Sequence, residues 1–215
     1  LGGQRQRYQY YGYEKCGHSS SYSVRRTNIR HAGLAAPEIE FEPMGEHYAD
    51  RVAVAKAFHE AKPIHVNRCR EDFVLYLLSG YSEPWFALNA DGEVIGYLVT
   101  NLESKGIREI ASRSVETSME MLVAWTDRIE DDIHVTVQPD DVALSRALGN
   151  IAENVSVNGS GNWQVFDWET TLTALLTVQH RGRRLVEGSV VIGIDEATFE
   201  MTVDGQHVRC ERVEI

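Results

Sequence analysis

Cysteine is scarce in this sequence, and its spacing excludes two common ways of stabilising a small domain. Of 215 residues only Cys16, Cys69 and Cys210 are cysteines, and they are odd in number, far apart and outside any CxxC pattern. Neither a disulfide framework nor a structural zinc site fits such a set. The eight histidines also lack HExxH or other short ligand spacing, so the sequence predicts no metal site.

Long hydrophobic runs are absent as well, which argues against a membrane protein. No segment is apolar over the length that a bilayer-spanning helix needs, and the amino terminus does not resemble a leader peptide. With 43% hydrophobic and 25% charged residues, the composition is typical of a soluble globular protein of one or two domains. We therefore expect a protein of the reducing cytoplasm that has no membrane partner.

Positive charge is scarce outside the first 36 residues of the chain. The formal net charge is −11, but residues 1–36 carry six basic and one acidic side chain, whereas the remainder carries 15 basic and 31 acidic ones. An acidic body disfavours nucleic acid as a partner and would attract cationic ligands, although it also serves solubility. The acidic clusters at residues 127–132 and 140–141 leave two interpretations open, a rim for a polyamine-like substrate or a solvated face.

The pattern of apolar residues predicts strands and helices in a mixed order. Residues 21–38 run from an alternating strand into small residues that end at Pro37, as a linker would. Asp91-Gly92 separates two β-rich runs and predicts a hairpin, and Ser114 is a capping candidate for the amphipathic helix after it. The expected order is strand, two helices, hairpin, strand, helix, strand, helix and strand, over residues 38–44, 46–62, 70–80, 84–101, 106–112, 114–129, 131–139, 140–155 and 162–168. This order predicts an α+β fold with helices packed on a mostly antiparallel sheet.

The stretch RQRYQYYGYEKCG at residues 5–17 places four tyrosines and a glycine between two clusters of positive charge. Tyr8, Gly12 and Tyr13 form a Tyr-x-x-x-Gly-Tyr pattern. The pattern is compatible with an aromatic strand packed beneath a helix. It is equally compatible with part of a reaction centre whose other half lies upstream of residue 1.

The same pattern carries a resemblance to a known family. Many GNAT acetyltransferase domains end with Tyr-x-x-x-Gly-Phe or Gly-Tyr, and the opening stretch resembles the version in multidomain enzymes related to the enhanced-intracellular-survival type. In those enzymes a catalytic GNAT domain is followed by a degenerate GNAT domain and a sterol-carrier-like domain. The resemblance implies that residues 1–24 are the terminal strand region of an upstream catalytic domain and that 25–37 are a linker. Residues 38–168 then resemble the second, GNAT-like domain, and 169–215 resemble a partial, small α+β sterol-carrier-like domain with a helix, Gly188 and paired strands.

The resemblance also implies an activity and site residues. The chain would be the carboxyl-terminal portion of an acetyl-CoA-dependent N-acetyltransferase that acts on a small-molecule amine, and it would be inactive alone. Tyr8 would be the general acid that protonates the leaving thiolate. Arg5 and Arg7 are candidates for contacting the phosphates of coenzyme A, or are simply solvated. Acetyl-CoA would be bound mainly by the upstream domain, and we expect a homo-oligomer.

Two departures from the family pattern are visible in the sequence. GNAT enzymes hold the pyrophosphate with a glycine-rich loop before a helix, and the corresponding stretch here, RSVETSMEM, contains no glycine. Family sterol-carrier-like domains are about twice as long as residues 169–215. The terminal carboxylate is proposed to act as a base in related enzymes, and that role is not transferred to Ile215.

Two functions of other classes remain open. The segment 38–215 could be a noncatalytic module that encloses an apolar ligand, which binding of an apolar probe would reveal. It could also serve assembly alone, which self-association without any ligand would reveal. The acetyltransferase hypothesis has the strongest motif support.

Overall fold

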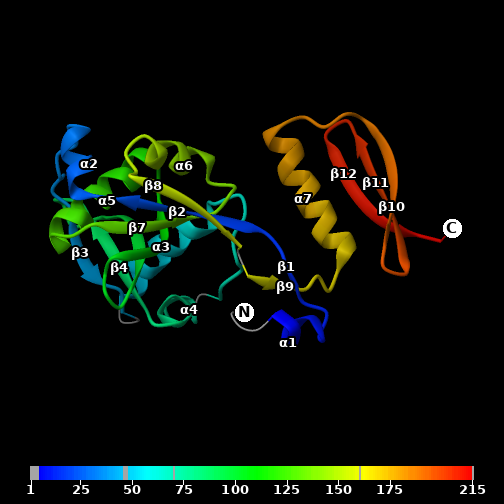
Figure 1. Ribbon diagram of the computed structural model, residues 1–215, viewed down its shortest axis with the longest axis horizontal. Helices are drawn as coiled ribbons and strands as arrows, with labels where there is room; N and C mark the ends of the chain where they lie inside the picture. Colours follow the sequence, from blue (N-terminus) through cyan, green and yellow to red (C-terminus); the bar gives the residue numbers. More distant parts are fainter. Residues whose placement is uncertain (1–4, 46–47, 70, 160, 215) are drawn as a thin grey trace. The chain divides into compact units, whose positions relative to one another are not determined.

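The computed structural model describes residues 5–45, 48–69, 71–159 and 161–214, and it divides the chain into two compact units (Figure 1). The central unit is residues 16–161. The terminal unit combines the two ends of the chain, residues 1–15 and 162–215.

A seven-stranded sheet forms the middle of the central unit. Its strands lie in the order β3 (Glu40–Pro43), β4 (Ser82–Leu88), β5 (Val94–Asn101), β6 (Gly106–Ser112), β7 (Ile133–Val137), β2 (His18–Val24) and β8 (Asn154–Gly159). All neighbours are antiparallel except β6 and β7, which are parallel. The fold is therefore α+β with a mostly antiparallel sheet, as the sequence predicts.

Helices cover both faces of this sheet and make two separate cores. The five helices described in this unit are α2 (Arg26–His31), α3 (Ala49–Glu60), α4 (Phe73–Leu78), α5 (Val115–Ile129) and α6 (Val142–Gly149). Because side chains alternate along a strand, Leu98 of β5 joins α5 and α6 in one core, whereas Tyr97 faces α3 and α4 in the other. The sheet is thus the middle layer of three.

Local signals in the sequence account for several of these elements. The hairpin between β4 and β5 turns where Asn89 Oδ1 accepts hydrogen bonds from the amides of Asp91 and Glu93, and Gly92 supplies a φ of +76°. Ser114 caps α5 by accepting a hydrogen bond from the amide of Thr117 at 3.2 Å. Both predictions are confirmed.

The structure differs from the sequence expectation at both ends of the central unit. Strand β2 lies within the central sheet, between β7 and β8, so the expected boundary after residue 24 cuts through the unit. Helix α2 occupies part of the expected linker 25–37, and β8 begins where a helix over 140–155 is expected. Strands β2 and β8 pair with each other although they lie far apart in sequence, which local patterns do not report.

The terminal unit is built from short elements and one hairpin sheet. It contains α1 (Arg5–Gln9), β1 (Glu14–Lys15), β9 (Asn162–Trp163), α7 (Trp168–Gly182), β10 (Gly188–Ile194), β11 (Ala197–Asp204) and β12 (His207–Val213). Strands β10, β11 and β12 form an antiparallel sheet, and α7 packs on it above the buried side chains of Phe199 and Cys210. Helix α7 followed by paired strands is the order of elements expected for residues 169–215, and the sterol-carrier-like identity of this segment stays a prediction.

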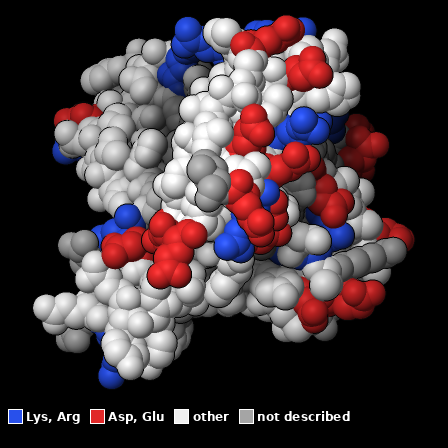
Figure 2. All heavy atoms as spheres, turned by 90° about the vertical axis from the view of Figure 1, so that its right-hand side faces the viewer, with Lys and Arg blue, Asp and Glu red and all other residues white. Residues whose placement is uncertain are grey.

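Charged side chains on the surface are mixed in sign. On the face shown in Figure 2, Asp and Glu side chains predominate and Lys and Arg side chains lie among them. No helix in the described ranges is long and apolar enough to cross a membrane.

Candidate functional site

Tyr8 lies on a helix whose end is capped by the glycine of its own motif. After α1 the amide of Gly12 donates to the carbonyl of Gln9 at 2.9 Å, and the amide of Tyr13 donates to the carbonyl of Tyr8 at 3.1 Å. Gly12 has a φ of +78°, the left-handed conformation that glycine adopts without strain. These two bonds and this glycine define a Schellman motif.

The Tyr-x-x-x-Gly-Tyr spacing has a geometric meaning in this motif. The residue after the capping glycine regularly makes an apolar contact with the residue five positions earlier. Here the rings of Tyr8 and Tyr13 meet edge to face, with centroids 6.1 Å apart and an interplanar angle of 71°. The pattern is therefore a helix end rather than a packed strand, and the glycine stop signal could have indicated it.

Residues from the other end of the terminal unit hold this turn in place. Strand β1 pairs with β9 through Glu14 opposite Trp163 and Lys15 opposite Asn162. A Cβ added to Gly12 would lie 3.0 Å from Nε2 of Gln164, so the Gln164 side chain rests directly against the turn. The half-buried ring of Tyr8 thus lies on a turn that is held by contacts with residues 162–164.

Of the two arginines predicted to contact phosphate, only Arg7 has a side chain that the structure describes. Arg7 is exposed on α1. The side chain of Arg5 lies outside the part of the chain that the structure describes. Their predicted role in cofactor binding therefore stays a prediction.

The amino terminus of α5, where a GNAT fold would bind pyrophosphate, does not fit that group. Ser114 caps the helix, and its hydroxyl also reaches the side chain of Thr117 at 3.3 Å. The pKa of Glu116 is lowered by hydrogen bonds from its own backbone amide and from Ser114. The amide of Thr117 is therefore already bonded to Ser114, and the negative charge of Glu116 in the first turn would repel a pyrophosphate.

A side chain of the protein also bonds to the backbone of β6, where this strand no longer pairs with β7. Only Gly106 and Ile107 of β6 pair with β7 among the described residues, so the rest of β6 has no strand on that side. The ammonium of Lys62 donates to the carbonyl of Ile110 at 2.7 Å. Lys62 therefore satisfies a backbone group on the part of β6 that has diverged from β7.

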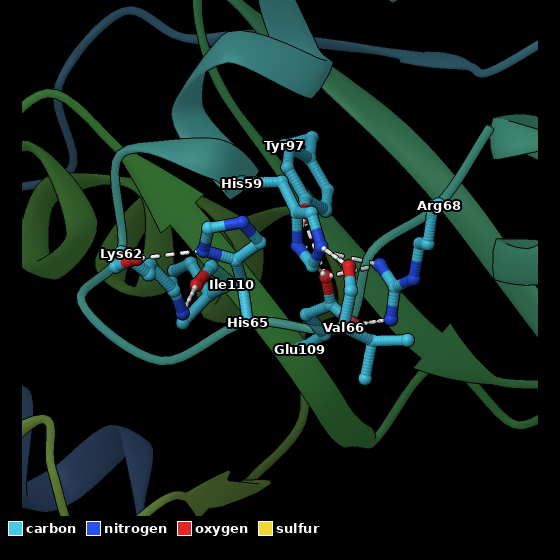
Figure 3. Close-up of polar contacts among 8 residues, drawn as sticks. All are labelled: His59, Lys62, His65, Val66, Arg68, Tyr97, Glu109 and Ile110. Atoms are coloured by element: carbon cyan, nitrogen blue, oxygen red, sulfur yellow. Dashed lines mark hydrogen bonds and ion pairs between the residues drawn. The ribbon is translucent and has the colours of Figure 1, made fainter. Parts of the chain in front are cut away.

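A buried polar network lies beside Lys62, on the sheet face that carries α3 and α4 (Figure 3). Arg68 makes a two-pronged ion pair with Glu109, with both N···O distances at 2.8 Å. The phenol of Tyr97 donates to the same carboxylate at 2.5 Å. His59 donates from Nε2 to the carbonyl of Val66 at 2.8 Å, and its Nδ1 lies 3.4 Å from Glu109.

The surroundings of Glu109 and Tyr97 set the protonation states of these two groups. Burial raises the pKa of Glu109, but hydrogen bonds from His59, Arg68 and Tyr97 outweigh burial and hold that pKa far below its ordinary value. Burial and the nearby Glu109 charge raise the pKa of Tyr97 well above its ordinary value. Glu109 stays charged and Tyr97 stays neutral near pH 7, so neither suits general acid–base catalysis there. The network anchors the segment between α3 and α4 to the sheet.

The acidic clusters that could attract a polyamine are largely engaged within the chain. Asp131 pairs with Lys105 at 2.5 Å, and Asp132 accepts a hydrogen bond from the backbone amide of Arg26 at 2.9 Å. Asp141 caps α6 by accepting from the amide of Leu144. These contacts favour the solvated, structural interpretation. In the described ranges no group of three or more His, Cys, Asp or Glu side chains could hold a metal ion.

Comparisons with known proteins identify the fold. No protein-family model and no curated protein matches the chain. A conserved protein of unknown function from Enterococcus faecalis V583, described as a probable N-acyltransferase, is 13% identical over 99% of this chain and 56% of its own, with a TM-score of 0.59. A GCN5-related N-acetyltransferase from Kribbella flavida is 15% identical over 100% of this chain and 55% of its own, with a TM-score of 0.56. The chain spans about half the length of these structures, and it shares their α+β, GNAT-like fold.

Proposed function

We propose that this chain is the carboxyl-terminal portion of an acetyl-CoA-dependent N-acetyltransferase of the multidomain, enhanced-intracellular-survival-like type. The single observation that carries the proposal is the capped turn that holds Tyr8, in a chain whose two units together match GNAT-like structures. A sterol-carrier-like identity for residues 169–215 is part of the same proposal. It is supported by the order of α7, β10, β11 and β12.

Tyr8 supplies a proton in the proposed reaction. Acetyl-CoA, as substrate, brings the acetyl thioester, and the nitrogen of the acceptor amine forms a bond to the acetyl carbon as the carbon–sulfur bond breaks. The phenol of Tyr8 holds the proton that the leaving sulfur takes up. The proton that the amine nitrogen releases restores the phenol through solvent. Gly12 and Tyr13 orient the phenol by fixing the end of α1.

Acetyl-CoA should not bind to the central unit. We expect no heat when acetyl-CoA is titrated calorimetrically into the 215-residue chain at low salt, because Glu116 and Ser114 occupy the amino terminus of α5. Low salt favours any phosphate contact and so makes the test stringent. Binding with a micromolar dissociation constant would show that the central unit has a working cofactor site, and the active centre would then have to be sought there.

Removing the Tyr8 phenol should stop most of the catalysis. In the full-length protein, Tyr8→Phe should lower kcat by about 10²-fold, the usual loss when a positioned general acid is removed. Tyr10→Phe is the matched control, because Tyr10 lies two residues away and is exposed, and it should leave kcat unchanged. Unchanged turnover in Tyr8→Phe with any amine acceptor would contradict the assignment.

A noncatalytic role in binding an apolar ligand is supported by one observation. Several apolar side chains around α7 and β10 are exposed, among them Leu175, Val190 and Val191. In this alternative the terminal unit binds the ligand and Tyr8 is a structural residue. The Tyr8→Phe variant separates the two functions.

A further inference from the structure

The two edges of the central sheet differ sharply in their protection. Edge strands expose unpaired backbone groups, and proteins usually guard them with charged residues or proline. Strand β3 at one edge carries Glu40, Glu42 and Pro43. Strand β8 at the other edge has the sequence NVSVNG, with neither a charge nor a proline.

The unguarded strand also exposes apolar side chains. All six residues of β8 are exposed, and Val155 and Val157 remain 51% and 69% accessible. Val155 pairs with Tyr22 of β2, whose side chain is buried in the core with α5 and α6. Paired residues lie on one face of a sheet, so the two valines extend the apolar face of that core beyond its edge.

The order of residues in β8 makes it complementary to itself. Residues 154–158 read Asn-Val-Ser-Val-Asn in both directions, with Ser156 at the centre. In an antiparallel pair related by a two-fold axis at Ser156, Val155 would lie opposite the partner's Val157 and Asn154 opposite the partner's Asn158. Like side chains would therefore meet on each face, and no charge would be buried.

We propose that β8 is a homodimerisation edge, on which β8 of a second copy of this chain pairs antiparallel about Ser156. The interface is isologous, because each copy offers the same strand to the other. It joins two seven-stranded sheets into one and covers the apolar strip of each copy. The proposal does not depend on acetyltransferase activity, since it concerns only the edge of the sheet.

A charge introduced at the centre of the strand provides a specific test. Ser156 is exposed, so Ser156→Lys or Ser156→Glu should leave the fold intact, as far-ultraviolet circular dichroism and thermal unfolding would show. Either variant places like charges directly opposite each other across the two-fold axis, which opposes pairing. We expect the wild-type chain to sediment as a dimer at about 100 µM, because an interface built on one six-residue strand is small and small interfaces are weak. Each variant should sediment as a monomer.

Mixing the two variants distinguishes this interface from any other. An equimolar mixture of Ser156→Lys and Ser156→Glu should restore the dimer, because opposite charges then face each other at the centre. Ser189→Lys is the matched control, since Ser189 is an exposed serine on β10, another edge strand without charge or proline. That variant should remain a dimer.

Several outcomes would overturn the proposal. A monomeric wild-type chain would do so, as would a dimer that survives both Ser156 variants. Loss of the dimer in Ser189→Lys alone would assign the interface to β10 instead. Failure of the mixed variants to reassociate would show that β8 does not pair about Ser156.

Discussion

Glu109→Gln is expected to lower the free energy of unfolding of the central unit by about 3 kcal/mol. The reason is that the change removes a charge and leaves the Arg68 guanidinium, only 14% exposed, without its two-pronged partner. Tyr97, which is fully buried, also exchanges an ionised acceptor for a neutral one. Urea denaturation followed by tryptophan fluorescence would measure the loss, because Trp85 and Trp125 pack with the central core.

Variants of Arg68 distinguish the attraction within the ion pair from the cost of burying a single unpaired charge. Arg68→Met alone should destabilise the unit, since Glu109 is then left buried without its cation. The combination of Arg68→Met with Glu109→Leu should cost less than the sum of the two single changes, because no unpaired charge remains. If Glu109→Gln unfolds at the same urea concentration as the wild type, the network contributes nothing to stability.

The stability that Glu109 contributes should decrease in acidic solution. Because the folded pKa of Glu109 lies far below its ordinary value, its stabilising contribution is complete above the ordinary value of about 4.3 and is lost as the pH falls below it. The difference in stability between wild type and Glu109→Gln should therefore be constant from pH 7 to about pH 5. It should shrink progressively in more acidic solution.

Gly96→Ala should destabilise the central unit by about 3 kcal/mol, even though the change adds one methyl group. A Cβ at this position of β5 would lie 2.6 Å from Sδ of Met121, 2.7 Å from the carbonyl oxygen of Ala111 and 2.9 Å from Cβ of Ser112. Met121 is fully buried on α5, and the other two atoms are fixed to the backbone of the neighbouring strand, so they cannot move aside without shifting the sheet. Glycine is required here because β6 and the Met121 side chain of α5 both lie close to this position of β5.

Gly149→Ala provides the control for this prediction. Gly149 ends α6 in the same unit, and an added Cβ would meet nothing within 4 Å. Alanine is a better helix former than glycine, so this variant should be as stable as wild type or up to about 1 kcal/mol more stable. The same urea titration measures both variants, and equal effects would contradict the packing argument at Gly96.

The sequence predicts the elements whose signals are local. The alternation of apolar residues and the dipeptide Asp91-Gly92 suffice for the β4–β5 hairpin, and Ser114 marks the start of α5. The α+β class follows from the order of these elements. The alternating strand that begins at residue 21 is predicted, but its place between β7 and β8 is not, because pairing between segments far apart in sequence leaves no local signal. Strand β8 is missed, because the helix expected over residues 140–155 runs into its start.

The sequence identifies the residues of the candidate site, but it does not predict how they are arranged in space. The Tyr8, Gly12 and Tyr13 pattern is visible in the sequence, but a short helix ended by Gly12 is stabilised by pairing with residues 162–164, which no local pattern reveals. The absence of a glycine loop before α5 is also visible. The role of Glu116 at that helix terminus is not, because it depends on the conformation of its own backbone.

The position of β2 in the sheet has a consequence for how the protein folds. Strands β4, β5 and β6 pair in succession with their neighbours in sequence through short connections, so this part of the sheet can assemble from local hairpins. Strand β2 is synthesised before all of them, yet its partners β7 and β8 are the last strands of this sheet to be synthesised. Closing this long loop is entropically costly and must therefore come late in folding. Until then β2 leaves the ribosome as an unpaired strand, and the central sheet is complete only after residue 159 has been made.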